Sequence, residues 1–100
     1  MFSMTTEYAL RAIVWLAEHV DEGPVDNQRI AAGTQVPATY LAKVLQELVR
    51  ANLVSSRRGV GGGFHLERDP HEITILEVFV RLFLQLSDEF IDTIRWSKPD

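Results

Sequence analysis

The sequence contains no cysteine. This absence excludes disulfide bonds, thiolate-bound metal centres and thiol-based redox sensors built from this chain alone, because each of them needs a cysteine sulfur. The histidines do not replace it, since His19, His65 and His71 are isolated from one another along the chain and isolated histidines are usually ordinary surface residues. We therefore predict no metal site and no cofactor.

Long uncharged apolar runs and catalytic signatures are missing too. The most apolar stretch, residues 75–86, is interrupted by Glu77, Arg81 and Gln85, and the N-terminus lacks a charged segment followed by a cleavage site. No Ser/His/Asp, paired-carboxylate or metal-ligand arrangement is recognisable. We expect a cytoplasmic protein with no membrane partner that is not an enzyme.

The charge is divided unevenly along the chain. The net charge is −4, yet residues 27–68 carry six basic and two acidic residues, which gives this segment +4 and the remainder −8. The net charge alone argues weakly against a nucleic-acid partner, but this asymmetry predicts a local basic face and a separate acidic body.

Apolar periodicity predicts helices in the first half of the chain. The first helix is expected from about Thr5, a candidate N-cap, to Val20. Asp26 is expected to cap a short second helix that ends at Gly33, and Pro37 to lie in the first turn of a third. The third helix ends near Asn52 and is expected to bury these residues: Leu41, Val44, Leu45, Leu48 and Val49.

The short segments that follow predict a β-hairpin. The runs 53–57 and 63–68 flank a glycine-rich tip, and Leu53, Phe64 and Leu66 are expected to face the domain. Two helices joined by a short turn, a supporting helix and a hairpin form a winged helix-turn-helix. The predicted fold is therefore mainly α with a small β-hairpin, with residues 1–72 as the winged helix-turn-helix domain.

Residues 73–100 are expected to form a second unit, a long C-terminal dimerisation helix running from about Ile73 to Ile94 and capped by Asp69 or Thr74. Its apolar residues occupy more than one stripe, and a chain of this size cannot cover both. We therefore expect a homodimer, with this set of dimerisation residues: Leu82, Phe83, Leu86, Phe90 and Ile94. The alternative is a helical hairpin bent near Ser87, which folds back on the monomer.

The stretch RRGVGGGF, residues 57–64, admits three interpretations. A nucleotide phosphate loop is disfavoured, because it needs a following helix and usually a lysine with serine or threonine. A plain turn with incidental arginines is the second. The third is a DNA-binding wing, in which glycines let the backbone approach phosphates and an arginine enters the minor groove. The third interpretation explains why the arginines and glycines occur together.

Double-stranded DNA is thus the expected partner. The predicted contacts comprise the first helix and the start of the second, the start of the third helix, and the hairpin tip. They are Thr5, Asn27, Gln28, Ala38, Thr39, Tyr40, Lys43, Arg57, Arg58, Gly61 and Gly62. Tyr40 is ambiguous, since its ring suits the core and its hydroxyl suits a phosphate.

The stretches TTEYALRAIVWLAEH and YLAKVLQELVRANLVSSRRGVGGGFHL, in this order, closely resemble the IscR/NsrR-type winged-helix transcription regulators of the Rrf-two family. The resemblance covers residues 5–78. It implies sequence-specific DNA binding as a homodimer at inverted repeats, with Arg58 reading the minor groove and with Thr39 and Lys43 at recognition-helix contact positions.

The chain departs from that family after Val78. Many members carry three cysteines there and bind an iron–sulfur cluster, and this sequence has none, so the resemblance implies no cluster here. The leading prediction is a homodimeric transcription regulator that represses from an inverted-repeat operator. The alternative is a protein-interaction module on a winged-helix scaffold, with DNA binding weak or lost.

Overall fold

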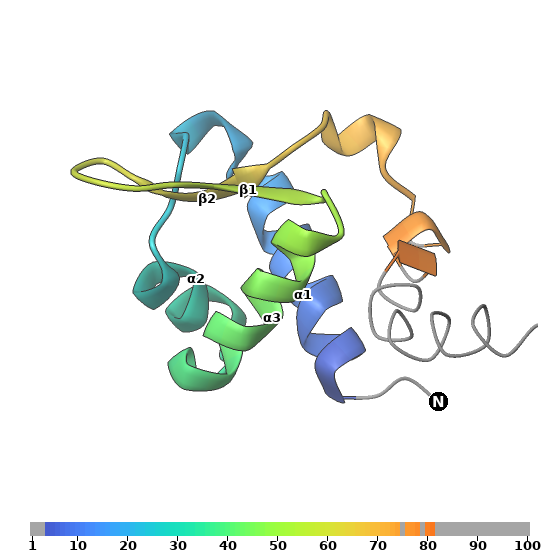
Figure 1. Cartoon of the computed structure of the whole chain (residues 1–100), viewed down its shortest axis with the longest axis horizontal. Helices are drawn as coiled ribbons and strands as arrows, with labels where there is room; N and C mark the ends of the chain where they lie inside the picture. The colour runs from blue at the N-terminus through green and yellow to red at the C-terminus, as the bar shows by residue number, and fades with distance from the viewer. Residues whose placement is uncertain (1–3, 75, 79, 82–100) are drawn as a thin grey trace, which may run out of the picture.

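Three helices form the body of the protein, and a two-stranded hairpin projects from it (Figure 1). The computed structural model describes residues 4–74, 76–78 and 80–81. Within them lie α1 (Met4–Glu18), the 3-10 turn η1 (Val20–Glu22), α2 (Asn27–Thr34), α3 (Ala38–Arg50), β1 (Val54–Arg57), β2 (Gly63–Leu66) and the 3-10 turn η2 (Pro70–Glu72). The order of these elements is that of a winged helix-turn-helix and confirms the predicted fold class.

The first helix packs closely against the other two because its inner face carries small residues. Ala9 and Ala12 are completely buried, and Ile13 and Leu16 continue the same face. The predicted N-cap role of Thr5 is wrong, because α1 already includes Met4 and Thr5. The α-helix also ends at Glu18, and Val20 lies in η1.

The second helix begins as predicted and ends differently. Asp26 is its N-cap, with Oδ1 accepting a 2.8 Å hydrogen bond from the backbone N–H of Arg29. At the other end Gln35 (φ 59°), not Gly33, takes the left-handed conformation, and its N–H donates to the carbonyl of Ala31. Gly33 lies inside the helix, where a Cβ would come within 2.1 Å of Trp15 Nε1. Packing against Trp15, rather than a helix end, explains this glycine.

The Asp26 cap leads to a stability prediction. We expect Asp26→Ala to lower the free energy of unfolding by about 1 kcal/mol, because the N–H of Arg29 loses its acceptor at the start of α2. Urea denaturation measures the change, and Asp21→Ala is the control, since Asp21 is exposed and lies outside α2. Equal stabilities of the two variants would contradict a capping role.

The third helix is amphipathic, as its periodicity predicted. Leu41, Val44, Leu45 and Leu48 are all at most 1% exposed, and Val49 is half-buried. Pro37 is the N-cap with an extended ψ of 133° and so precedes the helix, whereas the sequence had placed it in the first turn. A buried inner face leaves the opposite face of α3 available to a partner.

The hairpin is held to the body at its base. β1 and β2 pair antiparallel, and a 3.0 Å bond from the N–H of Glu67 to the carbonyl of Leu53 lies just beyond the ladder. Val25 forms an isolated bridge with Phe64, through bonds of 3.0 and 2.8 Å. Leu53 and Leu66 are buried and Phe64 packs on the core, as predicted. The tip, residues 58–62, extends beyond these contacts.

The chain after the hairpin turns once before it becomes helical. Asp69 accepts from the N–H of His71 and caps η2, and Thr74 Oγ1 accepts from the N–H of Glu77 at 3.0 Å. Residues 76–78, 80 and 81 are helical, so the predicted start at Ile73, which is extended, is wrong. The predicted dimerisation residues and the possible bend lie outside the described residues. Among the described helices, none is long and apolar enough to cross a membrane.

Candidate nucleic-acid interface

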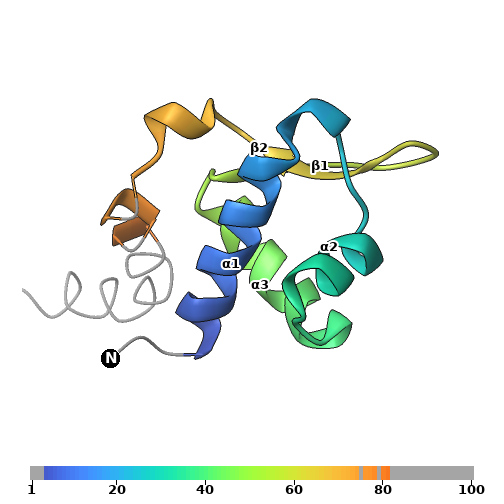
Figure 2. The ribbon, with the colours of Figure 1, turned by 180° about the vertical axis from the view of Figure 1, so that it is seen from behind.

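The hairpin tip, α2 and the first turn of α3 lie on one side of the molecule, and the helical residues after Thr74 lie on the other (Figures 1 and 2). On α3, Thr39, Ala42 and Lys43 are exposed, because Leu41, Val44 and Leu45 take the inner face. Ala38 is half-buried and packs on the core. The outer surface of the first turns of α3 therefore carries small side chains and one cation.

The backbone conformation and close contacts of the tip require its glycines. Gly59 and Gly61 have φ of +93° and +76°, a region that side chains with a Cβ rarely adopt. Gly62 donates to the carbonyl of Gly59 at 3.0 Å, and a Cβ on it would lie 2.2 Å from the carbonyl oxygen of Arg57. The result is a narrow tip whose only large side chains are those of Arg58 and Val60, both of them exposed.

The free cations of the described residues coincide with the predicted DNA contacts. Eight lysines and arginines lie in the described part, and five of them pair with carboxylates. These five are Arg11, Arg29, Arg50, Arg68 and Arg81. In the same part of the chain, Lys43, Arg57 and Arg58 have no ion pair or hydrogen bond through their side chains and are exposed.

The sequence count of charge overstated the breadth of the basic face. Arg29, Arg50 and Arg68 contribute to the +4 of residues 27–68, yet each contacts a glutamate. Arg29 pairs with Glu22, and this hydrogen bond is the main cause that holds the pKa of the Glu22 carboxyl below its ordinary value. Among the described residues, the uncompensated positive charge is thus concentrated on α3 and on the hairpin of residues 54–66, called the wing from here on.

A polar and aromatic cluster joins the starts of α1 and α3. The hydroxyls of Thr5 and Tyr40 are hydrogen-bonded at 2.9 Å, and the Tyr8 and Tyr40 rings meet edge to face at 5.1 Å. Tyr40 packs against the core, so its ring takes the core role that the sequence left open. The role of Tyr8 was missed, because nothing in the local pattern pairs residues 32 positions apart.

The start of α2 combines polar side chains that suit a phosphate with a carboxylate that repels it. Gln28 is exposed, and Asn27 is half-buried with a buried Oδ1 that has no hydrogen-bond partner among the described residues. The carboxylate of Asp26 already occupies this helix end and repels an anion. Of the two predicted contacts, Gln28 is the more exposed.

Comparison with known proteins identifies the family and raises the question of iron. The profile of the Rrf2 family, described as iron-dependent transcriptional regulators, matches residues 2–89. The residues present do not fit a thiolate-bound iron centre, because the sequence has no cysteine. Within the described residues, no group of three histidine, aspartate or glutamate side chains is placed to hold a metal ion either.

Relatives and solved structures agree with the family match. The chain is 36% identical over 88 residues to the HTH-type transcriptional regulator IscR of Photorhabdus laumondii, covering 88% of this chain and 51% of the relative. The structure of T. potens IscR matches with a TM-score of 0.75 at 28% identity, over 97% of this chain and 75% of that one. CymR, the global cysteine regulator of B. subtilis, matches with a TM-score of 0.76 at 32% identity, over 82% and 64%.

The chain spans about half the length of the curated relatives it matches. These proteins are transcription regulators rather than enzymes, in agreement with the expectation from the sequence. The family match extends over most of the chain, and the fold and element order agree with it. The chain therefore belongs to the Rrf2 family of transcriptional regulators.

Proposed function

We propose that this protein is a sequence-specific DNA-binding regulator that acts as a homodimer on an inverted-repeat operator and represses by occupying promoter DNA. The observation that carries the proposal is the position of the free cations. Lys43, Arg57 and Arg58 lie on α3 and the wing, and the other cations of the described residues are paired with carboxylates. Exposed, unpaired cations on a narrow wing and on a helix are suited to phosphates and groove edges.

In this proposal α3 enters the major groove by its first turns. Thr39 and Lys43 face the bases or nearby phosphates, Ala38 allows close approach, and the Tyr40 hydroxyl and Thr5 lie beside the phosphate backbone. The wing lies over the minor groove, where Arg58 inserts and Arg57 contacts the backbone. The Gly61 and Gly62 backbone passes close to the phosphates.

Dimerisation is proposed through the helix that begins after Thr74. Leu76 and Val80 lie one turn apart on this helix and are 72% and 43% exposed, so together they present apolar surface to a partner. A second copy that covers this face would place two α3 helices on two half-sites. Sedimentation equilibrium should therefore give a dimer, and a monomer at micromolar concentration would contradict this part of the proposal.

Binding is tested by fluorescence anisotropy with a duplex selected from a random pool by the protein itself. Affinity for this duplex should exceed that for unrelated DNA and should fall steeply with salt concentration, because phosphate contacts release counterions. Equal affinities for the two duplexes at physiological salt would reject sequence-specific regulation and favour the protein-interaction alternative.

The wing contact gives a single-residue prediction. Arg58→Ala should weaken binding to the selected duplex by about 1–3 kcal/mol, the usual contribution of a specific base contact. Arg50→Ala is the matched control, because Arg50 is exposed but pairs with Glu47 at 3.4 Å. If Arg58→Ala and Arg50→Ala bind the selected duplex with equal affinity, the wing does not contribute to DNA binding.

A further inference from the structure

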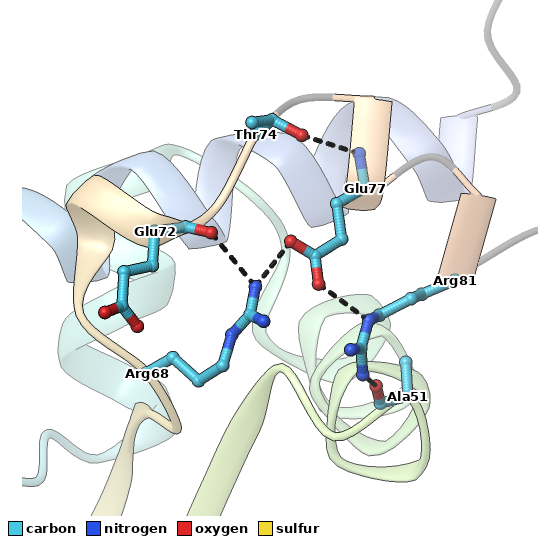
Figure 3. Close-up of polar contacts among 6 residues, drawn as sticks. All are labelled: Ala51, Arg68, Glu72, Thr74, Glu77 and Arg81. Carbon is cyan, nitrogen blue, oxygen red and sulfur yellow. Dashed lines mark hydrogen bonds and ion pairs between the residues drawn. The ribbon is translucent and has the colours of Figure 1, made fainter.

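One carboxylate in the helix after Thr74 binds two arginines, one of which reaches the end of α3 while the other lies just after β2 (Figure 3). Glu77 Oε2 accepts a 3.0 Å hydrogen bond from Arg81 Nε, and its Oε1 accepts from Arg68 Nη2. The backbone N–H of Glu77 is held in turn by Thr74 Oγ1. Hydrogen bonds thus hold both carboxylate oxygens and the backbone N–H of Glu77. The residue therefore has little freedom to move independently of its partners.

The Arg81 side of this cluster reaches the end of α3. Arg81 Nη1 donates a 3.0 Å hydrogen bond to the carbonyl of Ala51, the C-cap residue of α3. The last carbonyls of a helix lack partners within it and carry partial negative charge, so a guanidinium there is favourable. The Glu77 carboxylate orients this guanidinium by accepting the hydrogen bond from Arg81 Nε. The C-terminal end of the proposed recognition helix is therefore tied to the following helix.

The Arg68 side is connected to the wing along the chain. Arg68 lies two residues after β2, and its Nη2 also donates to the carbonyl of Glu72 at 3.2 Å. The hydrogen bond from Arg68 is the main cause that lowers the pKa of the Glu77 carboxyl, with the charges of Arg68 and Arg81 as further causes. The carboxylate therefore stays charged near neutral pH and separates two guanidinium groups that would otherwise repel each other.

We propose that Glu77 is a positioning residue that sets the orientation of the wing relative to α3 through Arg68 and Arg81, and thereby couples the helix after Thr74 to DNA recognition. The proposal rests on the proposed function. A displacement of Glu77 moves both guanidinium groups at once: that of Arg81, which is bonded to the C-cap of α3, and that of Arg68, which lies two residues beyond β2 in the chain. A partner or second copy that moves this helix would change the wing and α3 together.

The coupling is tested first without DNA. The chain has no cysteine, so Ser56→Cys on β1 and Gln46→Cys on α3, both exposed, give unique spin-label sites. Double electron–electron resonance, on labelled protein diluted with an excess of unlabelled protein so that a dimer carries at most one labelled chain, should show one narrow distance distribution. Adding Glu77→Gln, or in a second variant Arg81→Gln, should broaden or shift the distribution. A role limited to stability would lower the unfolding temperature and leave the distribution of the folded protein unchanged, and that result would overturn the proposal.

DNA binding of the unlabelled variants provides the second measurement, at a temperature where each is folded. Glu77→Gln should bind the selected duplex about threefold to thirtyfold more weakly than the wild type, the range of a coupling that acts at a distance. Glu47→Gln is the control with unchanged affinity, because it removes the same charge from an exposed pair on α3. If the wild-type protein shows no sequence preference, the proposed function is rejected. If the wild type and Glu77→Gln bind the selected duplex with equal affinity, only the coupling is rejected.

Discussion

Reversing two of the free cations, in the double variant Lys43→Glu/Arg58→Glu, should weaken binding to the selected duplex by about 4 kcal/mol, roughly a thousandfold. Each reversal removes one contact on a different element, α3 or the wing, and introduces repulsion from the phosphates. Because these elements carry separate contacts, the two losses should be close to additive. Anisotropy at physiological salt measures the loss, and the salt dependence of the residual binding should be shallower than that of the wild type.

The control for this variant has the same change in net charge. Arg11→Glu/Arg50→Glu reverses two cations that are paired, with Glu7 at 2.9 Å and with Glu47 at 3.4 Å. Exposed ion pairs contribute little to stability, so this protein should remain folded. It should bind DNA within a fewfold of the wild type. A similar loss in both double variants would mean that total charge, and not the surface of Lys43 and Arg58, determines binding.

This comparison addresses how an anionic protein binds an anionic duplex. At physiological ionic strength, screening limits interactions between exposed charges to about 8 Å. A phosphate in contact with Arg58 therefore responds to the charges around the wing tip rather than to the net charge of −4. Local placement of unpaired cations is sufficient for binding if the control variant behaves as expected.

The sequence predicted the features that depend on local signals. The periodicity of α3 identified its buried face through Leu41, Val44, Leu45 and Leu48, since side-chain direction in a helix follows from spacing alone. Asp26 was recognised as a cap because the N-cap acceptor lies next to the helix that it starts. The paired runs around the glycines likewise gave the hairpin. These signals need no knowledge of distant residues.

The features that depend on tertiary contacts could not be predicted in this way. Gly33 was interpreted as a helix end, but it faces Trp15, and Gln35 takes the left-handed conformation instead. The charge of residues 27–68 was counted without knowing that Arg29 pairs with Glu22 and Arg68 with Glu77. Ion pairs between segments depend on the fold, and no spacing rule identifies them.

The start of the C-terminal helix shows two capping signals in competition. Asp69 and Thr74 were both candidate caps, and the structure uses both, Asp69 for η2 and Thr74 for the helical residues that follow. Ile73 between them is extended, with φ −108° and ψ 124°. The apolar pattern alone extended the helix to Ile73, because periodicity does not detect a turn that ends within the same apolar run. The placement of Thr74 in turn fixes Glu77 beside Arg68.

Gly63→Ala is expected to lower the free energy of unfolding by about 3 kcal/mol. Gly63 has φ +143°, and a Cβ there would lie 2.5 Å from both the carbonyl carbon and the carbonyl oxygen of Val25 and 2.9 Å from the amide nitrogen of Asp26. These are backbone atoms, which cannot rotate away as the end of a side chain can. The strain and the overlap each cost about 1–3 kcal/mol, and relief requires breaking the bridge between Val25 and Phe64.

The matched control is Gly61→Ala, because Gly61 also has a positive φ (+76°) but a Cβ there meets nothing within 4 Å. It should cost only the backbone strain, about 1 kcal/mol. Urea denaturation of both variants, followed by circular dichroism, separates the overlap from the strain. Hydrogen exchange at the Val25 and Phe64 amides, which bond across the bridge, should accelerate in Gly63→Ala and not in Gly61→Ala. Equal losses of stability would show that the wing does not depend on its close contact with Val25.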